Sequence, residues 1–314
     1  MSFSGMVKEE LSRQIGVARH CKAAELSSLL CACGRIKPDG TLSFQMENDS
    51  VVRKYFTLLQ KTFNIETVIT VKEGSYAKKG YTYQVEIRDP EEIAMILSAT
   101  KLEQDENRDT LSLANTLAIQ NACCKRAFIR GAFLAAGSMS DPEKSYHFEI
   151  VSPEETKARQ LQSVIRSFDI DAKIVQRKKS YVVYVKEGAQ IVDLLAVMEA
   201  GNSLMNLENI RIVKEIKNSI NRKVNCEAAN ISKTVEAAVK QKTDIELIRD
   251  RIGFDSLSEG LAEVAELRLQ YPEAALKELG MMLTPQVGKS GVNHRLRKLS
   301  QIAEELRRNE EDLL

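Results

Sequence analysis

The stretch KRAFIRGAFLAAGSM at residues 125–139 has a second copy earlier in the chain, KAAELSSLLCACGRI at residues 22–36. When the two stretches are aligned, apolar and small residues fall on matching positions. The matched pairs are Leu26 with Ile129, Leu30 with Phe133, Ala32 with Ala135 and Gly34 with Gly137. This shared pattern indicates an internal repeat, and a repeat means that the fold is built from two similar units.

The similarity continues beyond this helix in both copies. TLSFQMEN from Thr41 matches SYHFEIVS from Ser145, and both alternate apolar and polar residues as half-buried strands do. An amphipathic helix, a pair of strands and a closing helix then follow in each copy. We therefore expect an α+β fold of two αββαββα units, at about residues 20–100 and 123–200, whose antiparallel sheets form one pseudo-twofold saddle.

Small residues recur at i,i+4 spacing on the helix that begins each repeat. Ser28 and Ala32 lie on the first helix, and Gly131 and Ala135 occupy the same places on the second. Small side chains let two helix backbones approach closely, so we expect the two helices to pack side by side on the pseudo-twofold axis. The alternative is that the two helices are unrelated, and the matched strands argue against it.

With these features, residues 20 to about 200 resemble the LAGLIDADG homing-endonuclease fold. In that family, the residue before the final glycine of each signature helix is an acid that holds a divalent metal. Cys33 and Ala136 stand at these positions here, and Cys31 and Leu134 stand at the other acidic position of the signature. Magnesium and calcium need oxygen ligands, which neither a thiol nor a methyl group supplies.

Other acids near the two helices are Asp39 and Asp141, which follow in the next turn and would have to fold back to hold a metal. We therefore predict no catalytic residues, no metal at the signature positions and no nuclease activity. A saddle without metal can still hold duplex DNA through phosphate contacts, which require no chemistry. We favour a scaffold or a protein-binding surface over this DNA-holding role.

Basic side chains on the predicted sheets are the candidates for such phosphate contacts. Lysines and arginines on hairpins also commonly solvate an exposed sheet edge, and this alternative stays open. The candidate residues are Lys72, Lys78, Lys79, Lys173, Arg177, Lys178 and Lys179.

Length and composition are those of an ordinary globular protein with two or three domains: 314 residues, 43% hydrophobic and 28% charged. A net charge of +1 excludes neither nucleic acid nor acidic partners, because binding depends on where the charges lie. The first residues lack the apolar core of a secretory signal, and no apolar run is long enough to cross a membrane. We expect a cytoplasmic protein.

The six cysteines follow no regular framework, which fits a reducing compartment. Cys31 and Cys33 are too close together for a zinc motif, and histidine occurs only at His20, His147 and His294. We therefore predict no metal site and no cofactor, and we expect all six cysteines to be buried free thiols.

Residues 206–226 read as a basic helical linker, because Ile210, Val213, Ile216 and Ile220 follow helical spacing. The segment contains five basic and two acidic residues. It is either a solvated helix face or a connector that grips DNA phosphates. The candidate phosphate contacts are Arg211, Lys214, Lys217, Arg222 and Lys223.

Residues 227–314 are predicted to be entirely helical. Separate helices are expected over residues 230–241, 243–252 and 256–270, and a short one between Pro272 and the Thr284–Pro285 pair. The last helix begins near Lys289 and carries one apolar stripe spaced four, three, four and three residues apart. The stripe consists of Val292, Leu296, Leu299, Ala303 and Leu306.

A short helix, a turn and a helix with a basic amino end describe a helix-turn-helix, whose second helix reads the major groove. Residues 281–300 contain four basic residues and no acid. Asparagine pairs with adenine and arginine with guanine, and a helix N-terminus with a lysine suits a phosphate. The predicted DNA-binding residues are Lys289, Ser290, Asn293, His294, Arg295, Arg297, Lys298 and Gln301.

A helical hairpin with a solvated face is the alternative to this helix-turn-helix. The turn TPQVGK is longer than that of a compact helix-turn-helix and has no glycine at its corner. The sigma-factor type of helix-turn-helix tolerates such turns.

Three stretches of the chain resemble the WhiA family of bacterial sporulation and cell-division regulators: FIRGAFLAAGS, ENIRIVKEIKNSINRKVNCEAANISKT and VGKSGVNHRLRKL. The resemblance implies a degenerate LAGLIDADG domain at residues 1–205, the linker, and a DNA-binding domain at residues 227–314. It further implies a sequence-specific, nucleoid-associated transcription regulator in division, chromosome segregation or sporulation. Double-stranded DNA is the expected partner, with other transcription or division proteins held by the N-terminal domain.

The main alternative is an RNA-binding or splicing-assisting protein on a retired endonuclease scaffold. RNA recognition relies on aromatic stacking platforms. Aromatic residues make up only 5% of this chain, and they do not cluster.

Overall fold

The computed structural model describes residues 1–73, 81–104 and 109–311. The chain divides into two compact units, unit 1 (Met1–Lys214) and unit 2 (Glu215–Leu314). Each unit has a buried apolar core of its own. The boundary between the units falls inside the segment predicted as a linker.

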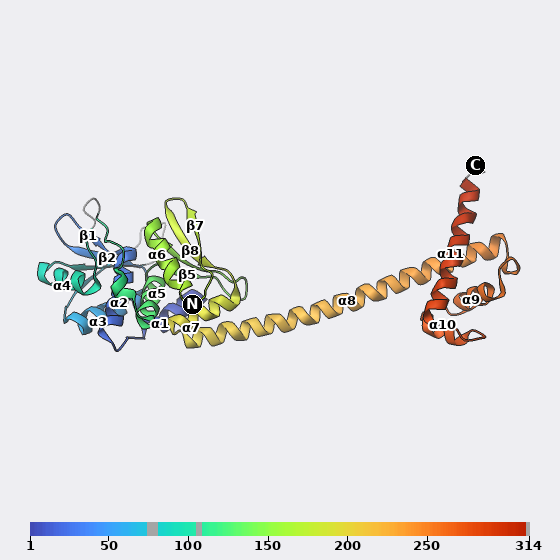
Figure 1. The fold of residues 1–314 in the computed structure, drawn as a ribbon, viewed down its shortest axis with the longest axis horizontal. Helices are drawn as coiled ribbons and strands as arrows, with labels where there is room; N and C mark the ends of the chain where they lie inside the picture. Colours follow the sequence, from blue (N-terminus) through green and yellow to red (C-terminus); the bar gives the residue numbers. More distant parts are fainter. Residues whose placement is uncertain (74–80, 105–108, 312–314) are drawn as a thin grey trace. The chain divides into compact units, whose positions relative to one another are not determined.

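Unit 1 contains the same succession of elements twice (Figure 1). The first copy consists of α2 (Arg19–Cys33), β1 (Arg35–Ile36), β2 (Leu42–Met46), α3 (Asp49–Phe63), β3 (Val68–Glu73), β4 (Tyr81–Ile87) and α4 (Pro90–Thr100). The second consists of α5 (Ala122–Ala136), β5 (Gly137–Met139), β6 (Phe148–Ser152), α6 (Glu155–Arg166), β7 (Lys173–Arg177), β8 (Ser180–Val185) and α7 (Gly188–Met198). A short 3-10 helix, η1 (Thr116–Ile119), precedes α5.

The two sheets have matching topologies, with strand orders β1-β2-β4-β3 and β5-β6-β8-β7. All strand pairs are antiparallel. Phe44 on β2 and Phe148 on β6 are buried, and the ring of Phe148 stacks on that of Phe133 of α5 at 5.1 Å between centroids. The expected αββαββα repeat with two antiparallel sheets is confirmed.

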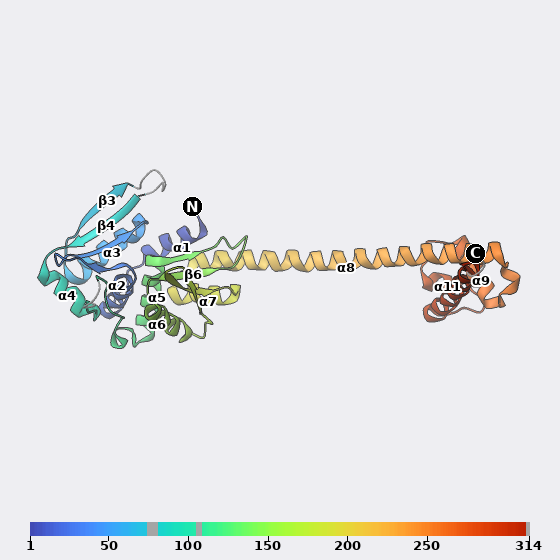
Figure 2. The same cartoon turned by 90° about the horizontal axis from the view of Figure 1, so that it is seen from above.

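Helices α2 and α5 lie side by side in both views of the molecule (Figures 1 and 2). The contact is closest at Gly131 of α5. A Cβ at this position would lie 2.1 Å from Ser28 Oγ and 2.5 Å from the backbone oxygen of Glu25. The expectation that small residues allow these helices to approach is thus confirmed for Ser28 and Gly131, whereas Ala32 and Ala135 are only half-buried.

Three charged side chains are buried beside this helix contact: Glu25, Lys54 and Arg130. The Glu25 carboxylate pairs with Lys54 and accepts hydrogen bonds from Arg130 at 3.2 and 3.3 Å. Burial holds the pKa of Lys54 below its ordinary value even though Glu25 raises it. Burial also lowers the pKa of Arg130, but Glu25 and Glu199 outweigh this effect, so that its pKa lies above the ordinary value.

An additional helix, α1 (Phe3–Ser12), precedes the first repeat and was not predicted. Its Glu10 carboxylate accepts hydrogen bonds from the backbone N–H groups of Asn202 at 2.8 Å and Ser203 at 2.9 Å. These N–H groups lie in the first turn of α8 and have no partner within that helix. Glu10 therefore holds the start of α8 in unit 1.

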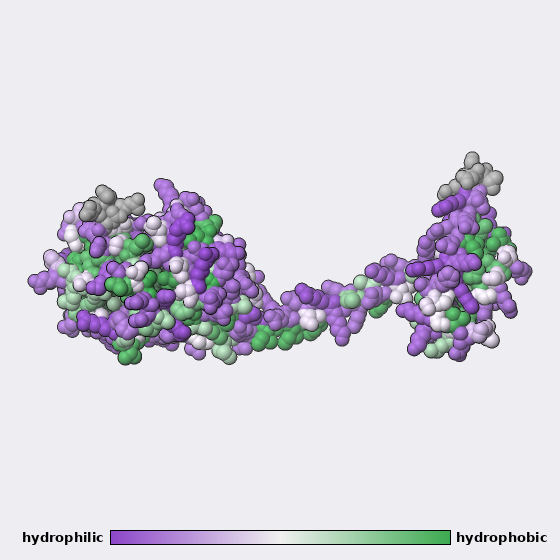
Figure 3. All heavy atoms as spheres, viewed as in Figure 1, coloured by the Kyte–Doolittle hydropathy of each residue, from purple (hydrophilic) through white to green (hydrophobic). Residues whose placement is uncertain are grey.

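Helix α8 (Gly201–Arg251) is continuous for 51 residues. The prediction of separate helices over residues 230–241 and 243–252 is wrong, because no glycine or proline interrupts residues 202–250. The hydroxyl of Thr234 donates to the backbone oxygen of Asn230, four residues earlier in the same helix. Figure 3 shows hydrophobic residues at the surface along α8, and the exposed ones include Met205, Ile212, Val213 and Ile216.

In unit 2, the end of α8 is followed by η2 (Phe254–Ser256), α9 (Glu259–Gln270), α10 (Leu276–Met282) and α11 (Lys289–Glu311). Helix α10 was expected to begin at Pro272, but it begins at Leu276. The carbonyl oxygens of Pro272 and Ala274 instead accept hydrogen bonds from buried Arg268, which fixes this segment as a turn.

Candidate nucleic-acid interface

The apolar stripe of α11 packs into the core of unit 2, as predicted. Val292, Leu296, Leu299 and Ala303 are at most 1% exposed, and Leu306 is half-buried against the same core. Leu279 and Leu283 from α10 and the following turn belong to this core. The opposite face of α11 is thereby left at the surface.

The C-terminal half of α11 is attached to the last part of α8. Arg307 donates a hydrogen bond of 2.6 Å to the carboxylate of Asp244, which is 1% exposed. Lys240 pairs with Glu304 at 3.2 Å. Arg307 and Glu304 of this half therefore serve the packing of unit 2, whereas no ion pair among the described residues involves the amino-terminal half.

The turn between α10 and α11 packs closely against a glycine of α10, Gly280. The backbone N–H of Val287 donates to the oxygen of Gly280 at 2.9 Å, and a Cβ at Gly280 would lie 2.1 Å from the oxygen of Val287. The N–H of Thr284 donates to the Glu263 carboxylate of α9 at 2.8 Å. The long turn is thus folded against both preceding helices.

We expect Gly280→Ala to lower the stability of unit 2 by about 1–3 kcal/mol, because the added methyl group meets a backbone oxygen that cannot rotate away. Hydrogen exchange of the α10 and α11 amides in the full chain measures this loss. Met281→Ala, at an exposed neighbouring position, is the matched control. Unchanged protection in Gly280→Ala would contradict the close approach.

The structure places six of the eight predicted DNA-binding residues on the open face of α11. Lys289 and Ser290 are the first two residues of this helix. Among the described residues, no ion pair involves Lys289, Arg297 or Lys298. The exposed residues are Lys289, Ser290, His294, Arg297, Lys298 and Gln301.

The other two predicted residues, Asn293 and Arg295, are half-buried. Asn293 lies at the edge of the open face. Arg295 differs from the rest, because its guanidinium donates to the backbone oxygen of Gly260 at 3.2 Å. Arg295 thus joins α11 to the first turn of α9.

The basic residues of the predicted linker fall into two groups on α8. Arg211 pairs with Glu208 at 2.7 Å, and Lys214 donates to the oxygen of Pro142 at 2.7 Å while its ammonium lies over the ring of Tyr146. These two are engaged within unit 1. The exposed members are Lys217, Arg222 and Lys223.

Basic side chains on the sheets are in part neutralised by acids. Arg177 pairs with Glu149 at 2.8 Å, and Lys173 pairs with Asp171 at 3.6 Å. Lys72 is exposed on β3, and Lys178 lies in the β7–β8 turn with φ 55°. Lys179 shares that turn, while Lys78 and Lys79 lie outside the described residues.

Helices α2 and α5 end at Cys33 and Ala136, the positions where the homing-endonuclease signature has its acids. Burial raises the pKa of the Cys33 thiol to about 12. Among the described residues, no group of three or more acids, histidines or cysteines surrounds these helix ends. The site thus lacks the oxygen ligands that a magnesium-dependent reaction requires.

The acids that follow these helix ends are held in their own turns. Asp39 accepts the backbone N–H of Thr41 at 3.0 Å, and this hydrogen bond lowers the pKa of its carboxyl group. Asp141 accepts the backbone N–H of Glu143 at 3.0 Å. Each carboxylate is therefore bound within the turn that contains it.

Not all cysteines are buried, contrary to expectation. Cys123 and Cys226 are exposed, and Cys21 and Cys33 are half-buried. None of the six cysteines forms a disulfide.

Three domain families match successive parts of the chain. Residues 19–103 match the WhiA N-terminal LAGLIDADG-like domain, residues 125–217 the WhiA LAGLIDADG-like domain, and residues 220–303 the WhiA C-terminal HTH domain. The chain belongs to the WhiA family. The expected architecture of a two-repeat LAGLIDADG-like saddle followed by an all-α helix-turn-helix domain is confirmed.

Relatives in the WhiA family match over nearly the whole chain. A protein named "Probable cell division protein WhiA" from Lachnoclostridium phytofermentans is 59% identical over 312 residues, covering 98% of this chain and 100% of the relative. A protein of the same name from Clostridium botulinum is 47% identical, covering 98% and 99%. Both are named for cell division and not for an enzymatic activity.

Among solved WhiA structures, the full-length "DUF199/WhiA from Thermatoga maritima" aligns with a TM-score of 0.60 and 25% identity over 97% of this chain and 99% of that chain. The N-terminal LAGLIDADG domain of DUF199/WhiA aligns with a TM-score of 0.51 and 23% identity over 63% of this chain and 90% of that chain. Within the described part of this chain, no helix has the length and apolar character needed to cross a membrane.

Proposed function

We propose that this WhiA-family protein is a sequence-specific transcription regulator that binds duplex DNA through α11. One observation carries the proposal. The amino-terminal half of α11 presents exposed basic and polar residues opposite a fully buried stripe. It contains no acid, because the first acidic residue of α11 is Glu304 in the C-terminal half. An exposed helix end of this charge, packed on a short helix and a turn, suits the major groove of B-DNA.

Each side chain of this face has a role set by its chemistry. Arg297 can donate two hydrogen bonds to a guanine, and Asn293 can pair with an adenine. Lys289, Ser290 and the first N–H groups of α11 are placed to bind a phosphate. His294, Lys298 and Gln301 flank the base-reading positions. Arg295 orients α11 through Gly260 and is not assigned to a base.

Unit 1 would then act without nuclease chemistry, since Cys33 and Ala136 occupy the metal-holding positions of its two repeats. Its pairs of basic residues with Glu149 and Asp171 favour a scaffold or a protein-binding surface over a continuous phosphate-binding face. Because the relatives are named for cell division, we assign the regulated genes to division. The resemblance of the sequence to the WhiA family extends this proposal to chromosome segregation or sporulation. The expected location is cytoplasmic and nucleoid-associated.

Arg297→Ala is expected to weaken binding to the specific duplex by about 5–150-fold, which corresponds to about 1–3 kcal/mol for a bidentate base contact. Its effect on random duplex should be smaller. Lys217→Ala and Lys223→Ala should weaken both duplexes equally and reduce the salt dependence by about one counterion each. Titration of a selected duplex and a random duplex at two salt concentrations distinguishes these effects.

Arg308→Ala is the matched control, because Arg308 is an exposed arginine of the same helix beyond the first acids. It should leave sequence preference unchanged. Equal losses for both duplexes in Arg297→Ala would refute the base-reading role of α11. Magnesium-dependent cleavage of either duplex would refute the absence of nuclease activity, and preference for single-stranded RNA would favour the RNA-binding alternative.

A further inference from the structure

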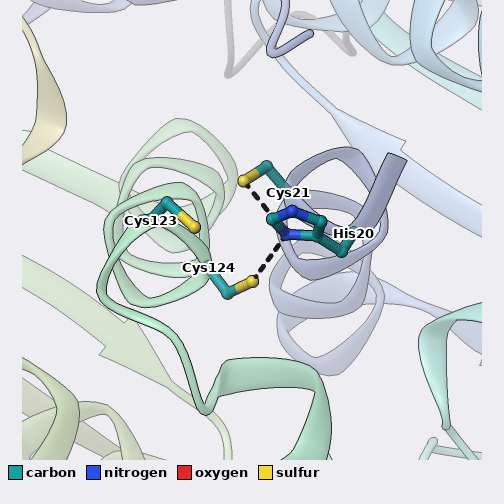
Figure 4. A group of neighbouring side chains, drawn as sticks. All are labelled: His20, Cys21, Cys123 and Cys124. Carbon is teal, nitrogen blue, oxygen red and sulfur yellow. Dashed lines mark hydrogen bonds between the residues drawn. The ribbon is translucent and has the colours of Figure 1, made fainter. Parts of the chain in front are cut away.

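Four side chains with metal-binding atoms converge where α2 and α5 begin: His20, Cys21, Cys123 and Cys124. Each offers one ligand atom, and the four atoms all lie within 4.8 Å of one another. His20 Nδ1 lies 3.1 Å from the sulfur of Cys124 and 3.4 Å from that of Cys21. Figure 4 shows the imidazole of His20 next to both sulfurs, with Cys123 beside them on α5.

The four residues occupy equivalent positions in the two repeats. The alignment that pairs Lys22 with Lys125 also pairs His20 with Cys123 and Cys21 with Cys124. Because α2 and α5 pack side by side, the two dipeptides face each other across the contact between the repeats. Each repeat supplies half of a four-ligand set, so the group lies close to the pseudo-twofold axis.

The donor atoms and their spacing fit zinc. Three sulfurs and one imidazole nitrogen form a set typical of structural Zn²⁺ sites, whereas magnesium and calcium require oxygen. Tetrahedral coordination with Zn–S bonds of about 2.3 Å separates two sulfurs by about 3.8 Å. No two of the four ligand atoms lie more than 4.8 Å apart, so they need to move by only about 1 Å to reach this separation. Rotation of the exposed side chains of His20 and Cys123 can supply this movement.

We propose that His20, Cys21, Cys123 and Cys124 bind one Zn²⁺ that joins the two repeats of unit 1. Four protein ligands leave no open coordination position, so the site is structural and carries no reaction. The proposal concerns unit 1 alone and is independent of DNA binding by α11.

The surroundings of the cluster suit such a site. Three thiolates and a neutral imidazole around Zn²⁺ carry one net negative charge, and the N-termini of helices stabilise negative charge. The first turns of α2 and α5 contain no acid, and they contain Lys22 and Lys125. Ala24 and Ala127, which are at most 1% exposed, pack against Cys124 and exclude water on the inner side.

Zinc content of the full chain, purified without chelators and under reducing conditions, tests the proposal. We expect one zinc per chain by elemental analysis, and cobalt in its place should give the visible spectrum of a tetrahedral thiolate site. Cys123→Ser changes an exposed residue, so the chain should fold while its zinc affinity falls by at least about 100-fold. Cys226→Ser, at an exposed cysteine of α8, is the matched control and should keep one zinc.

A second readout separates binding from folding. Chelation should lower the melting temperature of the wild-type chain and of Cys226→Ser, and it should leave that of Cys123→Ser unchanged. The absence of zinc from the reduced, folded wild-type chain would overturn the proposal. So would a disulfide between Cys21 and Cys123 or Cys124 in chains that contain no metal, or equal zinc content in the two serine variants.

Discussion

Gly131→Ala is expected to destabilise unit 1 by about 3 kcal/mol or more, although alanine ordinarily stabilises a helix interior by up to about 1 kcal/mol. The new methyl group would lie 2.5 Å from the backbone oxygen of Glu25 and 2.1 Å from Ser28 Oγ. A side chain can rotate away, but a helix backbone cannot. The whole of α5 would have to move away from α2.

Thermal and chemical unfolding followed by circular dichroism measures this loss. Gly201→Ala is the matched control, because a Cβ there would meet no atom within 4 Å. Combining Gly131→Ala with Ser28→Gly removes the contact to the hydroxyl but not the one to the Glu25 oxygen, so the rescue should be partial. A neutral or stabilised Gly131→Ala variant would show that the two helices do not approach as closely as described.

The contact between α2 and α5 could be predicted from sequence because it depends on local properties. Small residues at matching positions of two similar helices allow the two backbones to lie close together, and this does not depend on the rest of the fold. The stripe of α11 was predictable for the same reason, since Val292 and Leu296 bury one face of a single helix. Periodicity and side-chain size were enough in both cases.

The continuity of α8 was harder to predict. NISKT resembles a capping sequence, and a capping residue is favourable only where the preceding chain leaves the helix. Without a glycine or proline, nothing between residues 202 and 250 forces the chain to do so. Residues 215–237 of α8 are all exposed, so packing does not mark where one helix would end there.

The cluster of His20, Cys21, Cys123 and Cys124 was not predicted, because each dipeptide alone resembles no metal motif. Spacing along the chain was the wrong measure for ligands that come from two repeats. The usable signal was the repeat alignment itself, which places the two dipeptides at equivalent positions.

Glu25→Gln is expected to cost about 3–5 kcal/mol, the largest loss among these variants, because it leaves buried cations without their shared acid. The side chains of Lys54 and Arg130 are 0% and 4% exposed. Lys54 also donates to the oxygen of Leu11 at 2.9 Å, which does not neutralise its charge. Glu199 is the other acid bound to Arg130, at 2.7 Å, and is 54% exposed.

The pH dependence of stability distinguishes a stranded charge from a simple packing defect. In the folded chain the pKa of Lys54 lies below its ordinary value. At pH values between these two pKa values the unfolded chain binds more protons than the folded chain, so the stability rises with pH across this window. Without Glu25 the pKa of Lys54 falls further. Stability of Glu25→Gln should therefore rise with pH over a wider window that extends to lower pH.

Lys54→Met in the Glu25→Gln background should restore more than about 1 kcal/mol, since it removes the unpaired charge and fills the same volume. Glu199→Gln is the control, and because Glu199 is half exposed its loss should stay below about 1 kcal/mol. If Glu25→Gln cost no more than Glu199→Gln, and the double variant showed no recovery, Lys54 would be neutral in the folded chain. The buried pair would then be a hydrogen bond and not an ion pair.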